Sequence, residues 1–283
     1  MPIPKIIIHG GFFSEFSQTE TIKKAKQEAL LRIVGEAYKY LQKHSALQSV
    51  VYAIKLLEDD ALFNAGIGSQ IQSDGKIRMS ASIMDGTTQK FSGVINIENV
   101  QNPILVAEKL LAYDDRVLGG EGANLFARQQ GFPFFSTETP ERRAEYEAKK
   151  ASKGIGTVGC VALDENGHLA VATSTGGKGF EMVGRVSDSA TTAGNFANNV
   201  CAVSCTGVGE DIVSASLASK IVVRRTDGQS LAEAFKRSFE ELAVFDGFAG
   251  AIAIDREGNI FYQDSHPKMV FAYHDGSQSV VFD

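Results

Sequence analysis

Two dense β-type segments joined by one short turn constrain this chain more than any other feature. The segments cover residues 157–163 and 168–175, and Asp164-Glu165-Asn166-Gly167 joins them. Asp in the first place and Gly in the fourth favour a type I turn with Gly in a left-handed bulge. Both segments are apolar on both sides, as strands are when both faces of a sheet are covered. The hairpin therefore predicts a buried sheet within a layered fold.

The register of this hairpin decides which side chains share a face. In the bulged register Asp164 pairs with His168, and Thr157 then falls opposite Thr175. A tight two-residue loop would pair Asp164 with Gly167 and turn Thr175 to the other face. Threonine is common in strands for packing reasons alone, so the pair by itself favours a structural role. The bulged register nevertheless predicts two hydroxyls side by side.

Helical and strand patterns succeed one another along the rest of the chain. Helices are predicted over residues 19–43, 46–59, 103–111, 210–224 and 230–245, and strands over 5–9, 76–83, 91–97, 251–254 and 259–263. Ser45 and Gln48 form a candidate capping box, and Pro103 is suited to a first helical turn. Asp255-Arg256-Glu257-Gly258 repeats the turn signature of the first hairpin. We expect an α+β layered fold in a single domain spanning residues 1–283.

Composition excludes several classes of function. The net charge is -6 and no basic stripe is present, so a nucleic-acid partner is not expected. No segment approaches the roughly 20 apolar residues of a membrane span, which makes the cytoplasm the expected location and excludes a membrane partner. The cysteines, an odd number without a close pair, are expected to be buried free thiols: Cys160, Cys201 and Cys205.

A strongly charged segment precedes the hairpin. Nine of the sixteen residues from 138 to 153 are charged, which fits either a solvated helix face or an exposed linker. The segment ends at Gly154-Ile155-Gly156, directly before Thr157. An exposed linker at this place would leave room for a new chain end.

Short motifs follow one another in order along nearly the whole chain. They are His9-Gly10-Gly11, Glu58-Asp59-Asp60, Phe63-Asn64-Ala65-Gly66-Ile67-Gly68, Met84-Asp85-Gly86, Gly120-Glu121-Gly122-Ala123, Gly156-Thr157-Val158-Gly159, Ala172-Thr173-Ser174-Thr175-Gly176-Gly177, Gly184-Arg185-Val186-Ser187-Asp188-Ser189, Ala197-Asn198-Asn199 and Ser204-Cys205-Thr206-Gly207-Val208-Gly209-Glu210. Each motif is weak alone, but the ordered set resembles the plant-type asparaginases, also called isoaspartyl peptidases. That resemblance implies a four-layer αββα sandwich of the N-terminal nucleophile hydrolase type and a dimer of cleaved protomers.

The resemblance also implies that the chain cuts itself between Gly156 and Thr157. The products would be an alpha subunit, 1–156, and a beta subunit, 157–283. A threonine hydroxyl is a weak nucleophile that needs an adjacent base. A free α-amine, with a reference pKa of about 7.7–8.0, is such a base, and only the first residue of a chain owns one. Cleavage would thus prepare Thr157 to hydrolyse the side-chain amide of L-asparagine or of β-aspartyl dipeptides.

The family's other site residues match positions in this sequence. Thr175 matches a residue that supports the nucleophile, and Thr206 and Gly207 match the oxyanion donors. Arg185 and Asp188 match residues that hold the substrate's α-carboxylate and α-ammonium, roles that suit a guanidinium fork and a carboxylate. Gly209 matches a position at the substrate's amino-acid end, and Asn64 matches one near the acyl group.

No cofactor is expected for the chemistry, but the resemblance implies a structural sodium. In relatives a loop wraps the ion with backbone carbonyls, and the matching residues here are Leu57, Glu58, Asp60, Phe63, Ala65 and Ile67. Carbonyl ligands leave no side-chain signature, so this expectation comes from the resemblance alone.

Departures from the family pattern keep alternatives open. Phe12 and Phe13 replace small residues, and they either narrow the leaving-group wall or simply pack in the core. The related glycosylasparaginases carry Asn where this chain has Gly176, which places them second. A nucleotide-binding loop at residues 172–179 fails, because the motif needs Ser or Thr at the position of Gly179. A catalytically idle binding homologue is a third alternative.

Overall fold

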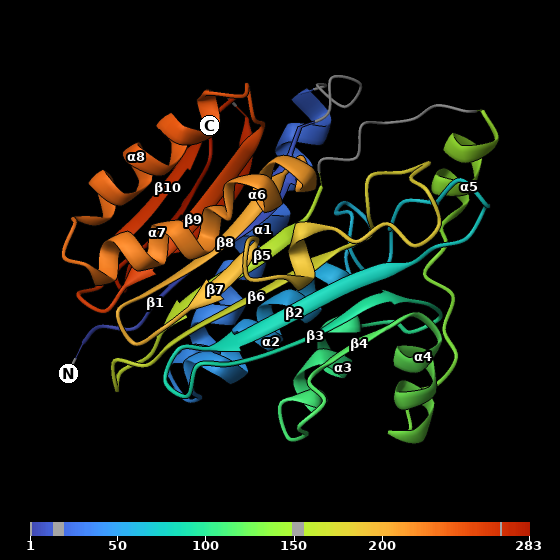
Figure 1. Ribbon diagram of the computed structural model, residues 1–283, viewed down its shortest axis with the longest axis horizontal. Coiled ribbons are helices and arrows are strands. Elements are labelled where there is room, and N and C mark those ends of the chain that lie inside the picture. The colour runs from blue at the N-terminus through green and yellow to red at the C-terminus, as the bar shows by residue number, and fades with distance from the viewer. Residues whose placement is uncertain (1, 14–19, 149–155, 267) are drawn as a thin grey trace.

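The computed structural model describes residues 2–13, 20–148, 156–266 and 268–283, and within them two β-sheets lie face to face (Figure 1). The larger sheet has eight strands in the order β12-β11-β1-β5-β6-β2-β3-β4. Its strands are β1 (Lys5–Phe12), β2 (Met79–Asp85), β3 (Lys90–Ile97), β4 (Val117–Gly119), β5 (Val158–Leu163), β6 (Leu169–Thr175), β11 (Met269–His274) and β12 (Ser279–Val281). The smaller sheet, in the order β10-β9-β8-β7, is built from β7 (Asn195–Ala197), β8 (Cys201–Gly207), β9 (Ala249–Asp255) and β10 (Ile260–Asp264).

Helices cover the outer face of each sheet. Against the larger sheet pack α1 (Glu20–Leu41), α2 (Ala46–Glu58), α3 (Pro103–Leu110) and α4 (Gly120–Gln129). Against the smaller sheet pack α6 (Gly209–Ala215), α7 (Leu217–Thr226) and α8 (Leu231–Ala243), while α5 (Pro140–Glu147) stands at the far end of the molecule (Figure 1). The mixed α+β fold is confirmed.

The apolar side chains divide by the face on which they lie. Along β5, Cys160 and Ala162 belong to the cluster beneath α1–α3, whereas Val161 and Leu163 belong to a cluster shared by the two sheets. A third cluster, which includes Val203 of β8, lies beneath the helices of the smaller sheet. This alternation explains why the hairpin strands are apolar on both sides.

The predicted hairpin and its register are confirmed. Val158 pairs with Ser174, as the bulged register requires. The Asp164 N–H donates to the His168 carbonyl at 3.0 Å, and Gly167 has a φ of 79°. A side chain at Gly167 would be strained, because the left-handed region favours glycine. The second hairpin has the same form, with Gly258 at a φ of 81°.

Several helix predictions are also confirmed, and one is wrong. The capping box of Ser45 and Gln48 is present, and Pro103 opens α3. The helix predicted over 210–224 is instead two helices, α6 and α7, divided at Ser216 with a φ of 50°. Past the break, the Ala218 N–H donates to the Ala193 carbonyl at 2.8 Å. The break at Ser216 thus allows the start of α7 to form a hydrogen bond with the segment before β7.

The charged segment, the cysteines and the remaining elements can be compared with the structure in the same way. Residues 140–147 of the charged segment form α5, which has no buried residues, so the solvated helix face is correct there; residues 149–155 lie outside the described part. The sequence patterns did not predict the helix α4 or the strands β4, β7, β8, β11 and β12. All three cysteines are free and buried, as expected. Among the described residues, no helix combines the length and the apolar character needed to cross a bilayer.

Candidate active site

The end of the β5–β6 hairpin brings two threonine hydroxyls together. Thr157 lies directly before β5, and its hydroxyl donates to Thr175 Oγ1 at 3.2 Å. The residues are 7% and 4% exposed, so the pair is largely shielded from water. The Gly177 N–H also donates to Thr175 Oγ1, at 3.2 Å. Thr175 therefore accepts two hydrogen bonds while its own proton is still available.

Asn64 contacts the chain on both sides of this pair. Its carbonyl accepts the Gly176 N–H at 2.8 Å, and its Nδ2 donates to the Gly177 carbonyl at 2.5 Å. A Cβ added to Gly156 would lie 2.7 Å from the Asn64 Cβ, which leaves room for glycine only. Asn64 thus fixes the turn after Thr175 and packs against the residue that precedes Thr157.

A buried histidine lies beneath the nucleophile candidate. His9 Nδ1 lies 3.0 Å from the Thr157 carbonyl oxygen, and His9 Nε2 lies 2.9 Å from Ser204 Oγ. Burial lowers the pKa of His9 to about 3, so the ring is neutral at ordinary pH. The sequence placed both His9 and Ser204 in motifs but gave neither residue a task.

Arg185 is held by Glu210 in a way that leaves one edge of its guanidinium free. Nε and Nη2 donate to the two carboxylate oxygens of Glu210 at 2.8 and 2.9 Å. These hydrogen bonds lower the pKa of Glu210 to about 2. Nη1 has no partner among the described residues, so the Nη1–Nη2 edge remains for a second carboxylate.

Asp188 lies close to this guanidinium and is a buried acid. It opens the short 3-10 helix η1 (Asp188–Ala190), is 2% exposed, and its Oδ2 has no hydrogen-bond partner in the described part of the chain. Burial raises its pKa to about 7. A Cβ on Gly209 would lie 2.8 Å from Arg185 Nη2 and 2.9 Å from Asp188 Oδ1. The backbone of Gly209 therefore touches both charged groups.

The end of β8 supplies Thr206 and Gly207. Thr206 Oγ1 is buried, and no described residue bonds it. Thr206 lies two positions after Ser204 and so shares its face of the strand, and Ser204 Oγ lies 2.8 Å from Thr173 Oγ1 of β6. Gly207 has a φ of 140°, and a Cβ there would lie 2.4 Å from the Phe248 carbonyl. Only glycine fits at that place.

One small hollow joins the two groups of residues. It is lined by Thr175, Gly177, Arg185 and Ser187, and by Gln72, Arg78, Ser80, Asn96 and Glu181. Glu181 is 4% exposed, and its Oε2 has no partner among the described residues. Sequence reasoning missed Glu181, because one charged residue in a loop carries no signal of burial.

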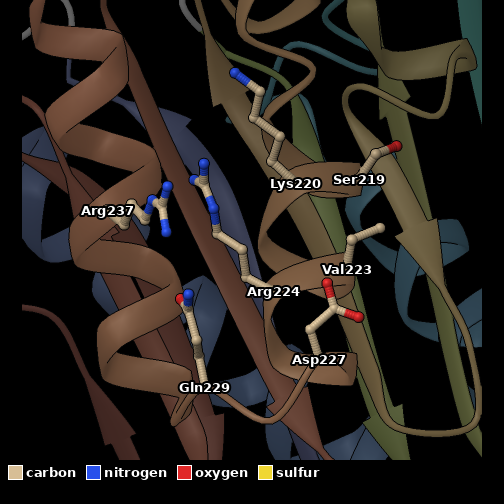
Figure 2. A pocket seen from close by; sticks show the side chains of 7 residues that line it. All are labelled: Ser219, Lys220, Val223, Arg224, Asp227, Gln229 and Arg237. Carbon is tan, nitrogen blue, oxygen red and sulfur yellow. The ribbon is translucent and has the colours of Figure 1, made fainter.

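A second hollow lies on the outer side of the smaller sheet, between α7 and α8. Figure 2 shows Lys220 and Arg224 of α7 and Arg237 of α8 around it. Glu241 pairs with Lys220 at 2.9 Å and with Arg237 at 3.8 Å, and it also contacts Arg224. None of the residues predicted for the site lines this hollow, whereas Thr175 and Arg185 line the first one.

The loop over residues 57–67 closes on itself next to β6. The Ile67 N–H donates to the Glu58 carbonyl at 2.7 Å, and Ser174 Oγ donates to the Glu58 side chain at 2.6 Å. Of the six carbonyls expected to hold sodium, those of Phe63, Ala65 and Ile67 accept no hydrogen bond from any described residue, whereas those of Leu57, Glu58 and Asp60 accept backbone N–H groups. Unpaired carbonyls in a closed loop are suited to holding a hard cation.

Phe12 proves to be a core residue. It is 4% exposed and meets the Phe248 ring edge-on at 4.6 Å between centroids. Phe13 is partly buried and packs against Phe282. For Phe12, the structure favours the packing alternative over a wall of the leaving-group site.

Comparison with known proteins agrees with this geometry. A family profile described as asparaginase matches residues 2–282. The isoaspartyl peptidase/L-asparaginase of Synechocystis sp. is 44% identical, over 97% of this chain and 88% of that protein. The plant-type L-asparaginase of Pyrococcus furiosus is 37% identical over 95% of each chain, and the isoaspartyl peptidase of Escherichia coli is 38% identical over 90% of this chain and 88% of its own.

These matches define the class of protein: the fold is that of the N-terminal nucleophile hydrolases. Within that class, the chain belongs to the asparaginase family, as the ordered motifs implied.

Proposed function

We propose that this chain hydrolyses the side-chain amide of L-asparagine and of β-aspartyl dipeptides, with Thr157 as the nucleophile. The observation that carries the proposal is the buried hydrogen bond between the Thr157 and Thr175 hydroxyls, 3.2 Å long, in a chain of this family. The names of the relatives, isoaspartyl peptidase and L-asparaginase, support both substrates.

The first step in this scheme is self-cleavage. The Thr157 hydroxyl attacks the Gly156 carbonyl carbon, and an ester replaces the peptide bond. Water then cleaves the ester, which leaves a carboxylate on Gly156 and a free α-amine on Thr157. Packing of Gly156 against Asn64, where a Cβ would lie only 2.7 Å from Asn64 Cβ, supports this step, because glycine accepts unusual backbone geometry.

Substrate hydrolysis then repeats the chemistry on a bound amide. The amine takes the hydroxyl proton while Thr157 Oγ1 attacks the substrate's side-chain carbonyl, and the leaving amine or ammonia departs with that proton. Water cleaves the resulting ester and releases aspartate. In this scheme Thr206 Oγ1 and the backbone of Gly207 stabilise the oxyanion, and Asn64 lies beside the acyl group.

The charged groups near Gly209 serve as the grip for the aspartyl end. The free Nη1–Nη2 edge of Arg185 receives the α-carboxylate, and the unpartnered Oδ2 of Asp188 receives the α-ammonium. Buried polar atoms without partners are costly, and a bound substrate removes that cost. We place the amino-acid end of the substrate against the Gly209 backbone.

The remaining parts of the proposal concern assembly. We infer a four-layer αββα sandwich in a single domain that matures into subunits 1–156 and 157–283, which pair as a dimer in the cytoplasm. Sodium would be held by carbonyls of the 57–67 loop, where those of Phe63, Ala65 and Ile67 accept no hydrogen bond from the described part of the chain. The ion would order the loop that carries Asn64, and no step of the chemistry requires a cofactor.

Mass spectrometry combined with a hydrolysis assay tests the proposal. Purified protein should yield fragments 1–156 and 157–283 and should release aspartate from L-asparagine and from β-aspartyl-leucine. Thr157→Ala should stay intact and lose at least about a thousandfold in activity, whereas Thr192→Ala, at an exposed position, should behave as wild type. A folded chain that neither cleaves nor hydrolyses would leave only the idle binding homologue. Activity confined to glycosylasparagine would favour the glycosylasparaginases.

A further inference from the structure

A continuous series of buried hydrogen-bonding groups runs from Thr173 of the larger sheet, through Ser204 of the smaller sheet and His9, to the backbone of Thr157. Thr173 Oγ1 lies 2.8 Å from Ser204 Oγ, and Ser204 Oγ lies 2.9 Å from His9 Nε2. His9 Nδ1 lies 3.0 Å from the Thr157 carbonyl oxygen. The side chains of Thr173, Ser204 and His9 are all fully buried.

Elementary chemistry fixes every proton in it. A carbonyl oxygen only accepts, so His9 Nδ1 must carry the proton. The ring is neutral, since burial lowers the pKa of His9 to about 3, and Nε2 is therefore an acceptor. The Ser204 hydroxyl must then donate to Nε2, and the Thr173 hydroxyl must donate to Ser204. One direction of hydrogen bonding satisfies all the groups.

The strand beneath the ring is shaped to admit this arrangement. A Cβ on Gly159 would lie 2.1 Å from His9 Nε2 and 2.1 Å from Ser204 Oγ. Gly159 pairs with His9 on one side and with Thr173 on the other, so it occupies the centre of the network. Glycine at position 159 therefore leaves the space between the sheets in which the His9 imidazole and the Ser204 hydroxyl meet.

We propose that His9 is a positioning residue for the nucleophile: a neutral Nδ1–H imidazole, held in that tautomer by the Thr173–Ser204 pair, that fixes the carbonyl of Thr157. This inference rests on the proposed role of Thr157. The imidazole touches neither the substrate nor the reacting hydroxyl, and it acts only through the Thr157 backbone.

Two anchors then define the conformation of Thr157. His9 fixes its carbonyl, and Thr175 fixes its hydroxyl. Together these restrict the rotations about the Cα–C and Cα–Cβ bonds of Thr157, which decide where its amine lies. An amine that must take the proton of its own residue's hydroxyl depends on that geometry. Loss of the carbonyl anchor should therefore lower kcat and leave substrate binding alone.

Nitrogen NMR of wild-type protein labelled with 15N-histidine tests the tautomer directly. The His9 resonances are assigned by their absence from His9→Asn. We expect a protonated Nδ1 and a bare Nε2 throughout the pH range of activity. A proton on Nε2, or titration to the imidazolium within that range, would overturn the proposal. This measurement needs no activity, so its outcome is independent of whether Thr157 is the nucleophile.

A matched pair of variants tests the positioning role. His9→Asn keeps an N–H at the place of Nδ1, whereas His9→Leu has the same branching without a donor. We expect kcat to fall roughly tenfold further in His9→Leu than in His9→Asn, with KM within about twofold and the pH limb unmoved. Equal kcat in the two variants would contradict the proposal.

Ser204→Ala gives a second route should the His9 variants fold poorly. It removes the donor to Nε2, so part of the His9 population should shift to the other tautomer and kcat should fall while KM stays. The control is Ser238→Ala, which removes an equally buried hydroxyl on α8, bonded to Arg224 and remote from the site. An unchanged tautomer and an unchanged kcat in Ser204→Ala would overturn the proposal. Failure of the proposed function would appear differently, as undiminished activity in Thr157→Ala.

Discussion

The two halves of the candidate site are built in opposite ways. Around Thr157, the groups are satisfied by one another: its hydroxyl bonds Thr175 and its carbonyl accepts from His9. Around the grip, polar atoms are buried without partners among the described residues, notably Asp188 Oδ2 and, in the hollow beside Arg185, Glu181 Oε2. The hydroxyl and carbonyl of Thr157 are thus satisfied within the described chain, whereas the grip leaves buried polar atoms open to a ligand.

This difference separates positioning from binding. A satisfied network holds its geometry before substrate arrives, which favours the chemical step. Unsatisfied buried atoms destabilise the free protein and are stabilised when a complementary ligand enters. Variants of the first half should therefore act on kcat, and variants of the second half on KM.

Loss of the guanidinium should have the largest effect. Arg185→Ala removes the carboxylate fork and leaves Glu210 paired with Lys178 alone. We expect kcat/KM for L-asparagine to fall by about 30- to 1000-fold, the equivalent of roughly 2–4 kcal/mol for a charge-assisted pair. Arg185→Lys keeps the charge and should recover only part of the loss. Arg237→Ala, at an exposed position on α8, is the control. Steady-state kinetics that show no change in Arg185→Ala would place the grip elsewhere.

Removal of the supporting hydroxyl tests the opposite half. Thr175→Val keeps the shape of the side chain but takes away the acceptor for Thr157. We expect kcat to fall about a hundredfold with KM nearly unchanged, and self-cleavage to slow in parallel. Time-resolved gels follow cleavage, and kinetics on the matured fraction give kcat. A variant altered in KM alone would contradict the division between the halves.

The pH dependence distinguishes the halves by a smaller effect. Burial raises the pKa of Asp188 to about 7, and the substrate's ammonium requires its ionised form. kcat/KM should therefore rise with pH through two ionisations, that of Asp188 near pH 7 and that of the Thr157 amine, and the Asp188 ionisation should vanish in Asp188→Asn. The limb in kcat should persist, since it belongs to the Thr157 amine of the bound enzyme. If both limbs survive in Asp188→Asn, the carboxylate does not hold the ammonium.

The same pKa has a consequence for stability. Because the folded pKa of Asp188 lies above its ordinary value of 3.8, its protonated form favours folding. The stabilisation is complete at low pH and is lost as the pH rises through about 7. Thermal melts of the free protein should show this loss, and Asp188→Asn should reduce it.

Substrate preference should change least when Phe12 is shortened. Phe12→Ala leaves a cavity beside Phe248, so it should lower the free energy of unfolding by about 3–5 kcal/mol. The ratio of kcat/KM for L-asparagine to that for β-aspartyl-leucine should stay within about twofold, because a side chain packed in the core does not contact the leaving group. A large change in this ratio would restore the role of this ring in leaving-group binding.

The hairpin and the hydroxyl pair could be predicted because local rules decide them. Turn residues at positions 164 and 167 set the register, and the register places Thr157 beside Thr175. The division at Ser216 could not be predicted in this way, since it depends on where the segment before β7 offers a carbonyl. Hydrophobic periodicity within one segment carries no information about such long-range contacts.

The grip and the histidine network depend on tertiary packing. Arg185 lies outside any regular element, and its proximity to Gly209 arises from how its loop meets the start of α6. The motif resemblance suggested Arg185 and Gly209. It could not predict that Glu210 binds one edge of the Arg185 guanidinium and leaves the other edge free, because that depends on the three-dimensional packing. Ser204 and Thr173 are ordinary strand residues until two sheets bring them within 2.8 Å.

The place of β1 in the larger sheet has a consequence for how the molecule is made. Ile6 pairs with Ala162 on one side and with His274 on the other, so both neighbours of β1 lie more than half of the chain away in sequence. Contacts so distant in sequence make folding slow, because the entropy of closing large loops is lost before the contacts that stabilise the sheet can form. A cut before Thr157 would also leave β1 clamped between two strands of the other fragment, so the fragments would separate only by unravelling the sheet.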